Sequence, residues 1–199
     1  MNTKRRRGEG LGDLHPLPSS LLLFVFILQA ACGGGHVAPK AQTTVALPPA
    51  NPMAVGKMVQ GVQAAKDGQR ERAASLLREA IGIDANLWEA RYDLGVVLAG
   101  AGDLAGAEEP LAAAAKRAPD SQEVAVALAE VRRRRDEHKL AAEGLADFVQ
   151  GHPNAVDART LYVATLRESG QIDKAIAEAR EVLVRKPADA AALAELALS

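Results

Sequence analysis

The sequence predicts an all-α protein of stacked helix–turn–helix units, preceded by an export leader and a flexible tether. Three observations support this fold class. Small and apolar residues recur every 34 residues from Ala54 onward. The composition is 48% hydrophobic but only 3% aromatic, which suits closely packed helices better than sheets. Glycines and prolines recur in the same register, at points where a helix must turn or stop.

The 34-residue period is visible in several series that keep one register. Each series places a small, apolar or proline residue at the same point of every unit, and such agreement is improbable by chance. These series are Gly61, Gly95, Ala129, Val163 and Ala197, then Ala73, Ala107, Ala141 and Ala175, and finally Ala85, Pro119, Pro153 and Pro187.

Each series has a physical role in a pair of antiparallel helices. Gly61 and Gly95 fall midway along a first helix, where the second helix crosses and a larger side chain would collide. Gly102 and its counterparts end the first helix, because the turn requires a residue that accepts positive φ. Pro119 and its counterparts prevent the second helix from continuing. The third unit departs from this pattern, with Asp136 in place of the glycine.

The spacing and residue types resemble the tetratricopeptide repeat, a helix–turn–helix unit of 34 residues. The copy that carries the resemblance best is WEARYDLGVVLAGAGDLAGAEEPLAAAAKRAPDS, residues 88–121. The resemblance implies a right-handed solenoid and covers the chain from residue 54 onward. The expected repeat region, 54–189, consists of four units at 54–87, 88–121, 122–155 and 156–189.

The last residues, AAALAELALS at 190–199, repeat the apolar spacing of a first helix. They therefore predict a first-helix stub of a fifth unit. Terminal units of a solenoid normally present a polar outer face. We expect the array either to continue in a longer reading frame or to be completed by pairing with itself or with another chain.

The beginning of the chain has the order of a bacterial export signal. The basic stretch MNTKRRR precedes an apolar run, Leu21–Leu28, which is too short to span a bilayer. The run ends in LQAAC, residues 28–32, which resembles the lipobox of bacterial lipoproteins. In that family the cysteine receives a lipid and becomes the first residue of the mature chain. Ordinary signal cleavage after Gly33 is the alternative.

Cys32 is the only cysteine of the chain, so lipidation explains a thiol that has no disulfide partner. Residues 1–31 are therefore predicted to be a lipoprotein signal peptide. Residues 32–53 are predicted to be the lipid-anchor cysteine and a flexible tether, because glycine, proline and small residues follow without an apolar period.

Several function classes lack support in the sequence. A formal net charge of -1 gives no field that attracts nucleic acid, and the run RRRRDEHK at 132–139 is interpreted as a solvated helix end. His138 and His152 do not belong to a cluster with metal-ligand spacing. Catalytic and phosphate-binding motifs are missing from the sequence. We expect no enzyme activity, metal, cofactor, nucleic acid or small-molecule substrate; a secreted or periplasmic enzyme subunit is the alternative.

A protein-binding groove is the predicted functional site. Stacked units curve and leave a concave surface lined by first helices, and Tyr92 is its expected anchor. The family's carboxylate clamp of Lys and Asn is missing, so a free C-terminal carboxylate is not the expected ligand. By helical phase and by the resemblance, the groove residues are Tyr92, Asp93, Val96, Val126, Glu130, Arg133, Thr160, Ala164 and Arg167.

A lipid-anchored array of this kind resembles the envelope lipoproteins that assemble larger machines. The alanine-rich texture of residues 88–111 and 179–198 is similar to the gliding-motility repeat lipoproteins of myxobacteria. This resemblance implies an outer-membrane scaffold that faces the periplasm and binds protein partners of a motility complex. Pilus assembly and outer-membrane-protein assembly are the alternatives.

Overall fold

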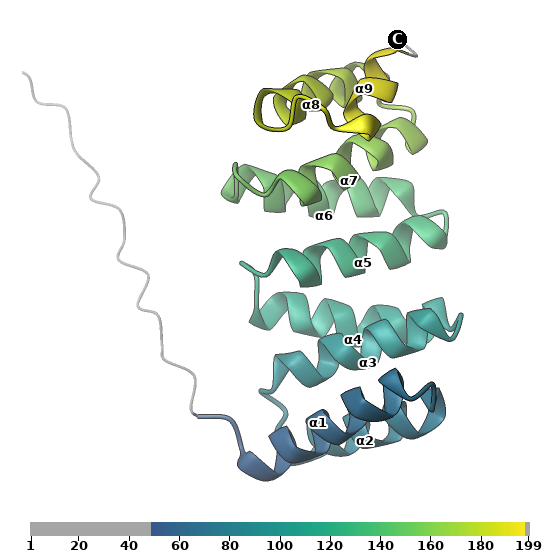
Figure 1. The fold of residues 1–199 in the computed structure, drawn as a ribbon, viewed down its shortest axis with the longest axis vertical. Helices are drawn as coiled ribbons and strands as arrows, with labels where there is room; N and C mark the ends of the chain where they lie inside the picture. The colour runs from purple at the N-terminus through teal and green to yellow at the C-terminus, as the bar shows by residue number, and fades with distance from the viewer. Residues whose placement is uncertain (1–48, 198–199) are drawn as a thin grey trace, which may run out of the picture. The chain divides into compact units, whose positions relative to one another are not determined.

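The computed structural model describes residues 49–197, which form nine α-helices and no strand (Figure 1). The all-α class and the helix-pair solenoid are confirmed. The predicted leader, Cys32 and the tether up to residue 48 lie outside the described residues. The pairs are α1 (Pro52–Lys66) with α2 (Arg70–Ile83), α3 (Trp88–Gly100) with α4 (Leu104–Arg117), α5 (Gln122–Arg134) with α6 (His138–Gly151) and α7 (Val156–Glu168) with α8 (Ile172–Arg185), followed by a single α9 (Ala190–Ala197).

The first helix begins slightly earlier than the sequence predicts. Asn51 is the N-cap of α1, and its side chain accepts a hydrogen bond of 2.9 Å from the backbone N–H of Met53. Pro52 follows at the first helical position, where its missing N–H costs nothing. Residues 52 and 53, assigned to the tether by the sequence, are therefore helical.

The turn inside each pair uses one residue in the left-handed region. Gly68, Gly102 and Gly170 have φ values of 78°, 88° and 79°, as the sequence predicts. Asp136 has a φ of 61°, so the third turn keeps the same conformation without a glycine. Aspartate tolerates this region better than most residues but not without cost.

The helix crossings differ between the two halves of the array. A Cβ added to Gly95 would lie 2.4 Å from Cγ of Leu111, and one added to Gly61 would lie 2.8 Å from Cγ of Leu77. The third and fourth pairs carry Ala129 and Val163 at this repeat position. Their helices contact each other less extensively than those of the first two pairs.

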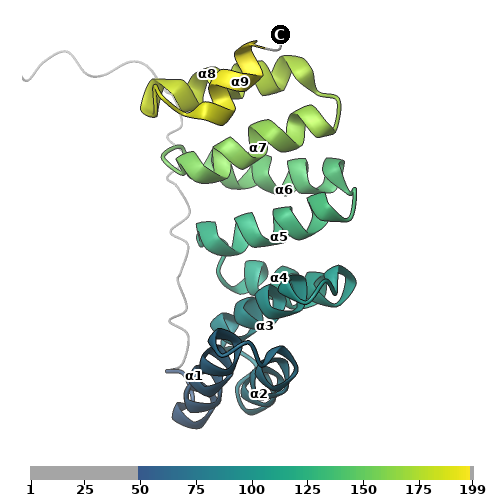
Figure 2. The ribbon, with the colours of Figure 1, turned by 45° about the vertical axis from the view of Figure 1, so that its right-hand side comes forward.

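The stacking of the pairs defines an inner and an outer side (Figure 2). Neighbouring first helices contact each other along the array, from α1 to α9, whereas no two of the second helices between residues 70 and 185 do so. The first helices therefore lie on the inner side of the curve. Successive clusters of buried apolar residues fill the space within and between the pairs. None of the helices between residues 49 and 197 has the length and apolarity needed to cross a membrane.

Candidate functional site

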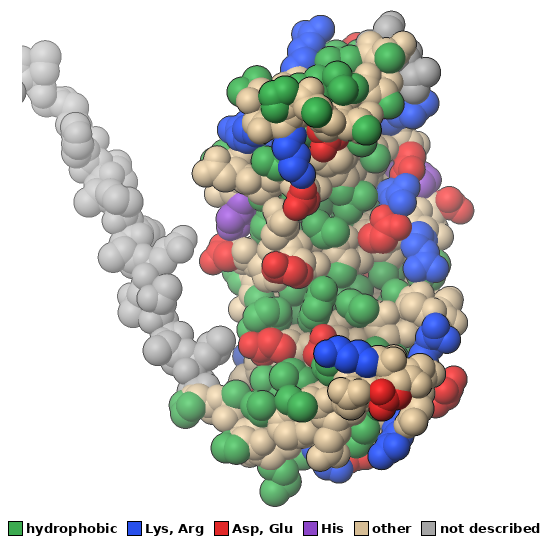
Figure 3. Space-filling model, in the orientation of Figure 1, with side chains coloured by type: hydrophobic (Ala, Val, Ile, Leu, Met, Phe, Trp, Pro, Cys, Tyr) green, Lys and Arg blue, Asp and Glu red, His purple; other side chains and the backbone are tan. Residues whose placement is uncertain are grey.

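The inner face presents equivalent positions of successive first helices. Tyr92, Val126 and Thr160 share one repeat position, on α3, α5 and α7. Figure 3 views the molecule from the side of the first helices, where green apolar side chains lie among red acidic ones along the middle. Such a face can bury apolar side chains of a partner and place its charged groups beside acidic side chains.

An aromatic and an aliphatic side chain on α3 form the apolar part of this face. The ring of Tyr92 is half-buried and packs against the core cluster that contains Leu111 and Leu128. Burial raises the pKa of the Tyr92 hydroxyl, and the nearby carboxylate of Asp93 raises it further. The side chain of Val96 is 44% exposed. A rigid ring supported by the core beside an exposed aliphatic group is a typical anchor for a partner.

Acidic side chains surround Tyr92. Burial raises the pKa of Asp93, and the carboxylate of Glu89 one helical turn away adds to the effect. Glu123 on α5 accepts a hydrogen bond of 2.9 Å from the hydroxyl of Ser121, and hydrogen bonding to its carboxylate lowers its pKa. Within residues 49–197, no cation pairs with Glu89, Asp93 or Glu123. This end of the inner face therefore carries unneutralised negative charge.

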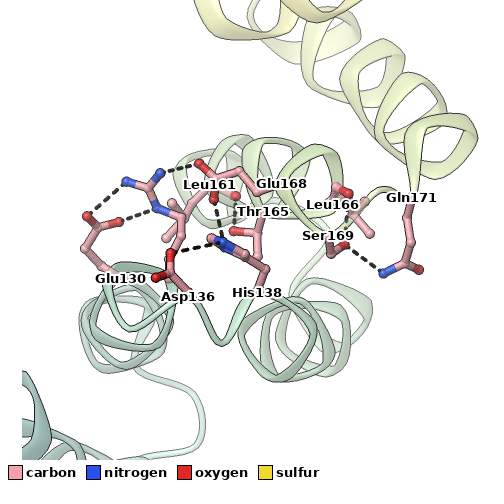
Figure 4. A network of polar contacts seen from close by, with 10 residues as sticks. Glu130, Asp136, His138, Leu161, Thr165, Leu166, Glu168, Ser169 and Gln171 are labelled. Atoms are coloured by element: carbon pink, nitrogen blue, oxygen red, sulfur yellow. Dashed lines mark hydrogen bonds and ion pairs between the residues drawn. The ribbon is translucent and has the colours of Figure 1, made fainter.

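The inner face of the third and fourth pairs has a different character (Figure 4). Arg133 donates to both carboxylate oxygens of Glu130, at 2.9 and 3.0 Å, and to Glu168 on α7 at 2.6 Å. Hydrogen bonding to Glu130 and then to Glu168 raises the pKa of Arg133. Nδ1 of His138 lies 3.3 Å from the second oxygen of Glu168. The predicted groove residues Glu130 and Arg133 are thus engaged in joining α5 to α7.

The remaining predicted groove residues lie on α7. The hydroxyl of Thr160 donates a hydrogen bond of 3.0 Å to the carbonyl of Val156, within the same helix. Ala164 and Arg167 line a cavity of about 360 Å³ between α7 and α9. Nε of Arg167 lies 3.7 Å from a carboxylate oxygen of Glu195, whose side chain is 6% exposed. This part of the face therefore also balances its own charges.

The arginine run at the end of α5 connects neighbouring pairs. Arg132 pairs with Glu108 of α4 at 3.2 Å, and Arg135 pairs with the same carboxylate. Arg134 donates a hydrogen bond of 3.2 Å to the carbonyl of Ala99 at the end of α3. The side chain of Arg132 is 17% exposed, and burial lowers its pKa. The run lies at the end of a helix, as the sequence predicts, and Arg134 is exposed, but Arg132 and Arg135 in addition bind Glu108 of the preceding pair.

A second cavity, of about 470 Å³, lies between α4, α5 and α6. Its apolar wall includes Leu128, Ala129 and Phe148. At its rim, His152 stacks on Phe148 with ring centroids 4.3 Å apart and lies 3.2 Å from Asp120. Between residues 49 and 197, no three His, Cys, Asp or Glu side chains are grouped so as to hold a metal ion.

Two features were not predicted from the sequence: the carboxylates of Glu89 and Glu123, which pair with no cation from residues 49–197, and the ion pairs between units. Arg133 and Glu168 are separated by 35 positions, which is close to one repeat. Opposite charges about one repeat apart on first helices are the signal that could have revealed such a pair. By the same comparison Lys57 of α1 would have been matched with Asp93, but in the structure Lys57 pairs with Glu79.

Comparison with known proteins supports the fold. Residues 64–131 match the family model described as tetratricopeptide repeat. YrrB, described as a TPR protein with an unusual peptide-binding site, is 21% identical with a TM-score of 0.63, over 71% of this chain and 73% of that one. MamA from Desulfovibrio magneticus RS-1 is 22% identical with a TM-score of 0.62, over 70% and 78%. Another MamA structure is 21% identical with a TM-score of 0.67, over 73% and 79%. No curated protein sequence matches the chain.

Proposed function

We propose that this tetratricopeptide-type solenoid is a scaffold whose concave face binds an extended or helical segment of a partner protein, without turnover. The observation that carries the proposal is the inner face of α3, where half-buried Tyr92 and exposed Val96 lie beside carboxylates that pair with no cation from residues 49–197. A face of this kind gains from a partner both apolar burial and neutralisation of charge. The peptide-binding site in the description of YrrB supports the same use of the fold.

The location that we propose for this scaffold is the bacterial envelope. The basic leader, the short apolar run and the single cysteine support export followed by lipidation of Cys32, with the mature chain on the outer membrane facing the periplasm. Two or three acyl chains would give a stable attachment, since one chain alone binds membranes weakly. The alanine-rich texture of the units supports a place in a gliding-motility complex.

The groove is tested by purifying the intact protein with its partners from the native envelope. Tyr92→Ala should lose the captured partner, because a rigid ring supported by the core is a typical anchor for a partner. Val184→Ala is the matched control, since Val184 on α8 is 75% exposed and lies on a second helix. Circular dichroism and thermal melts should show both variants folded. Equal capture by both variants would contradict the proposed groove.

The anchor is tested by expression in a Gram-negative host with radiolabelled palmitate. The wild-type chain should incorporate label, whereas Cys32→Ser should not, because the thioether bond requires the thiol. Labelling of both chains to the same extent, or of neither, would contradict lipidation at Cys32.

A further inference from the structure

The charged side chains of the inner face form ion pairs in some helices and not in others. On α7 and α9, Arg167 approaches Glu195, and Lys186 of the α8–α9 turn pairs with Asp157 at 2.6 Å. On α5, Arg133 is shared between its two glutamates. Arg133, Arg167 and Lys186 are therefore each paired with a carboxylate, so these groups offer little free charge to a ligand.

The carboxylates around Tyr92, by contrast, are not neutralised by ion pairs among the described residues. Glu89, Asp93 and Glu123 come from two neighbouring first helices, and none of them pairs with a cation within residues 49–197. The carboxylates of Asp93 and Glu123 both lie close enough to the Tyr92 hydroxyl to raise its pKa. Like charges beside a half-buried ring repel one another in the free protein. A cation placed between them would remove this repulsion.

We propose that the segment bound on α3 and α5 is basic, with Lys or Arg side chains beside aliphatic ones. This inference rests on the proposed groove and specifies the chemistry of its ligand. Aliphatic side chains of the segment cover Val96 and Val126, while its cations meet the carboxylates of Glu89, Asp93 and Glu123. A guanidinium can in addition lie over the ring of Tyr92, as cations do at exposed aromatic faces.

The occupant that we assign is a segment of another protein rather than the basic leader of this chain. The leader carries Lys4 and Arg5–Arg7, which have the required charge. However, the proposed export removes it before the mature protein reaches its partner. A peptide of residues 1–10 therefore serves as a competing probe in the test below.

The test is a selection of random 12-residue peptides on the purified full chain. Bound peptides should be enriched in Lys and Arg. Their affinity should fall on the order of 10-fold in the double variant Glu89→Gln/Asp93→Asn, since two half-exposed charge pairs contribute about 1 kcal/mol or somewhat more. The control Glu109→Gln/Glu143→Gln removes the same charge from exposed positions of α4 and α6 and should leave affinity unchanged.

The outcomes separate this inference from the proposed groove. Peptides that depend on Tyr92 but show no basic enrichment, or that bind the double variant as well as wild type, overturn the inference and leave the groove intact. Peptides that bind Tyr92→Ala unchanged overturn both, as does a selection that enriches no peptide. Tighter binding of the residue 1–10 peptide than of the selected peptides would overturn the assignment to another protein.

Discussion

The first two helix pairs and the last two share one backbone plan but use their side chains differently. In α1–α4 the crossings contain Gly61 and Gly95, so leucines of the second helices lie against the backbone of the first. In α5–α8 the same position carries Ala129 and Val163, and the helices of each pair contact less extensively. Between residues 49 and 197, Glu89 and Asp93 on α3 have no ion-pair partner, whereas Arg133 of α5 is paired with Glu130 and with Glu168 of α7.

The difference indicates a division of labour along the array. Close crossings hold the first two pairs together by packing, so the polar side chains of their inner face are free for a partner. The looser pairs add ion pairs between units, such as Arg133 with Glu130 and Glu168. Charged side chains that are paired in this way hold neighbouring units together, but they are no longer available to bind a partner. Unfavourable, unpaired groups on one surface are a common sign of function.

The largest expected effect comes from filling a close crossing. Gly95→Ala should lower the free energy of unfolding by about 1–3 kcal/mol, because the new Cβ would lie 2.4 Å from Cγ of Leu111. Gly82→Ala on α2 is the control, since a Cβ there meets nothing within 4 Å, and it should stabilise by up to about 1 kcal/mol. Urea unfolding measures both. If Gly95→Ala is neutral, the first two pairs do not depend on close crossings.

Substitutions at the left-handed turn residues should change stability by a smaller amount, and in opposite directions in the two halves of the array. Gly102→Ala should destabilise by about 1 kcal/mol, because φ at this residue is 88°. Asp136→Gly should stabilise by up to about 1 kcal/mol, because a glycine adopts the φ of 61° without strain. Thermal melts of the two variants should therefore move in opposite directions. A destabilised Asp136→Gly would show that the aspartate side chain has a role that its backbone conformation does not explain.

The ion pair between α5 and α7 should have a measurable but modest effect. A double-mutant cycle with Arg133→Gln and Glu168→Gln should give a coupling of about 0.5–1 kcal/mol, because both side chains are about one-third exposed and partly screened. The coupling should weaken in 1 M salt. The control is the cycle for Lys57 and Glu79, a more exposed pair in the first unit that should give less. Equal coupling in the two cycles would remove the distinction between the halves.

The smallest expected effect is the pH dependence of stability that Asp93 causes. The pKa of Asp93 is raised in the folded protein by burial and by Glu89, so folding favours the protonated carboxyl. Its contribution to stability is present at low pH and is lost as pH rises through the raised pKa. Asp93→Asn should therefore raise the melting temperature at pH 7 and leave it nearly unchanged at pH 3. An increase of the same size at both pH values would contradict the charge explanation.

The sequence predicted the fold better than the site. The 34-residue period places small residues where helices cross, and Gly95 against Leu111 follows directly from that geometry. The positive φ at Gly102 was equally predictable. The ion pairs of Arg133 with Glu130 and Glu168 were not predictable, because they depend on side-chain conformations and on the contact of α5 with α7. A periodic pattern specifies which residues share a face but not which of them are already paired.

The most direct test of the difference between the halves is photocrosslinking from Val96 and Ala164. These residues occupy the same repeat position on the inner face of α3 and α7. A photoreactive amino acid is introduced at each position in turn, in the full chain in its native envelope, and the yield of crosslinked partner is measured. Our account predicts a strong crosslink from position 96 and little from position 164. Equal yields, or a stronger crosslink from position 164, would contradict it.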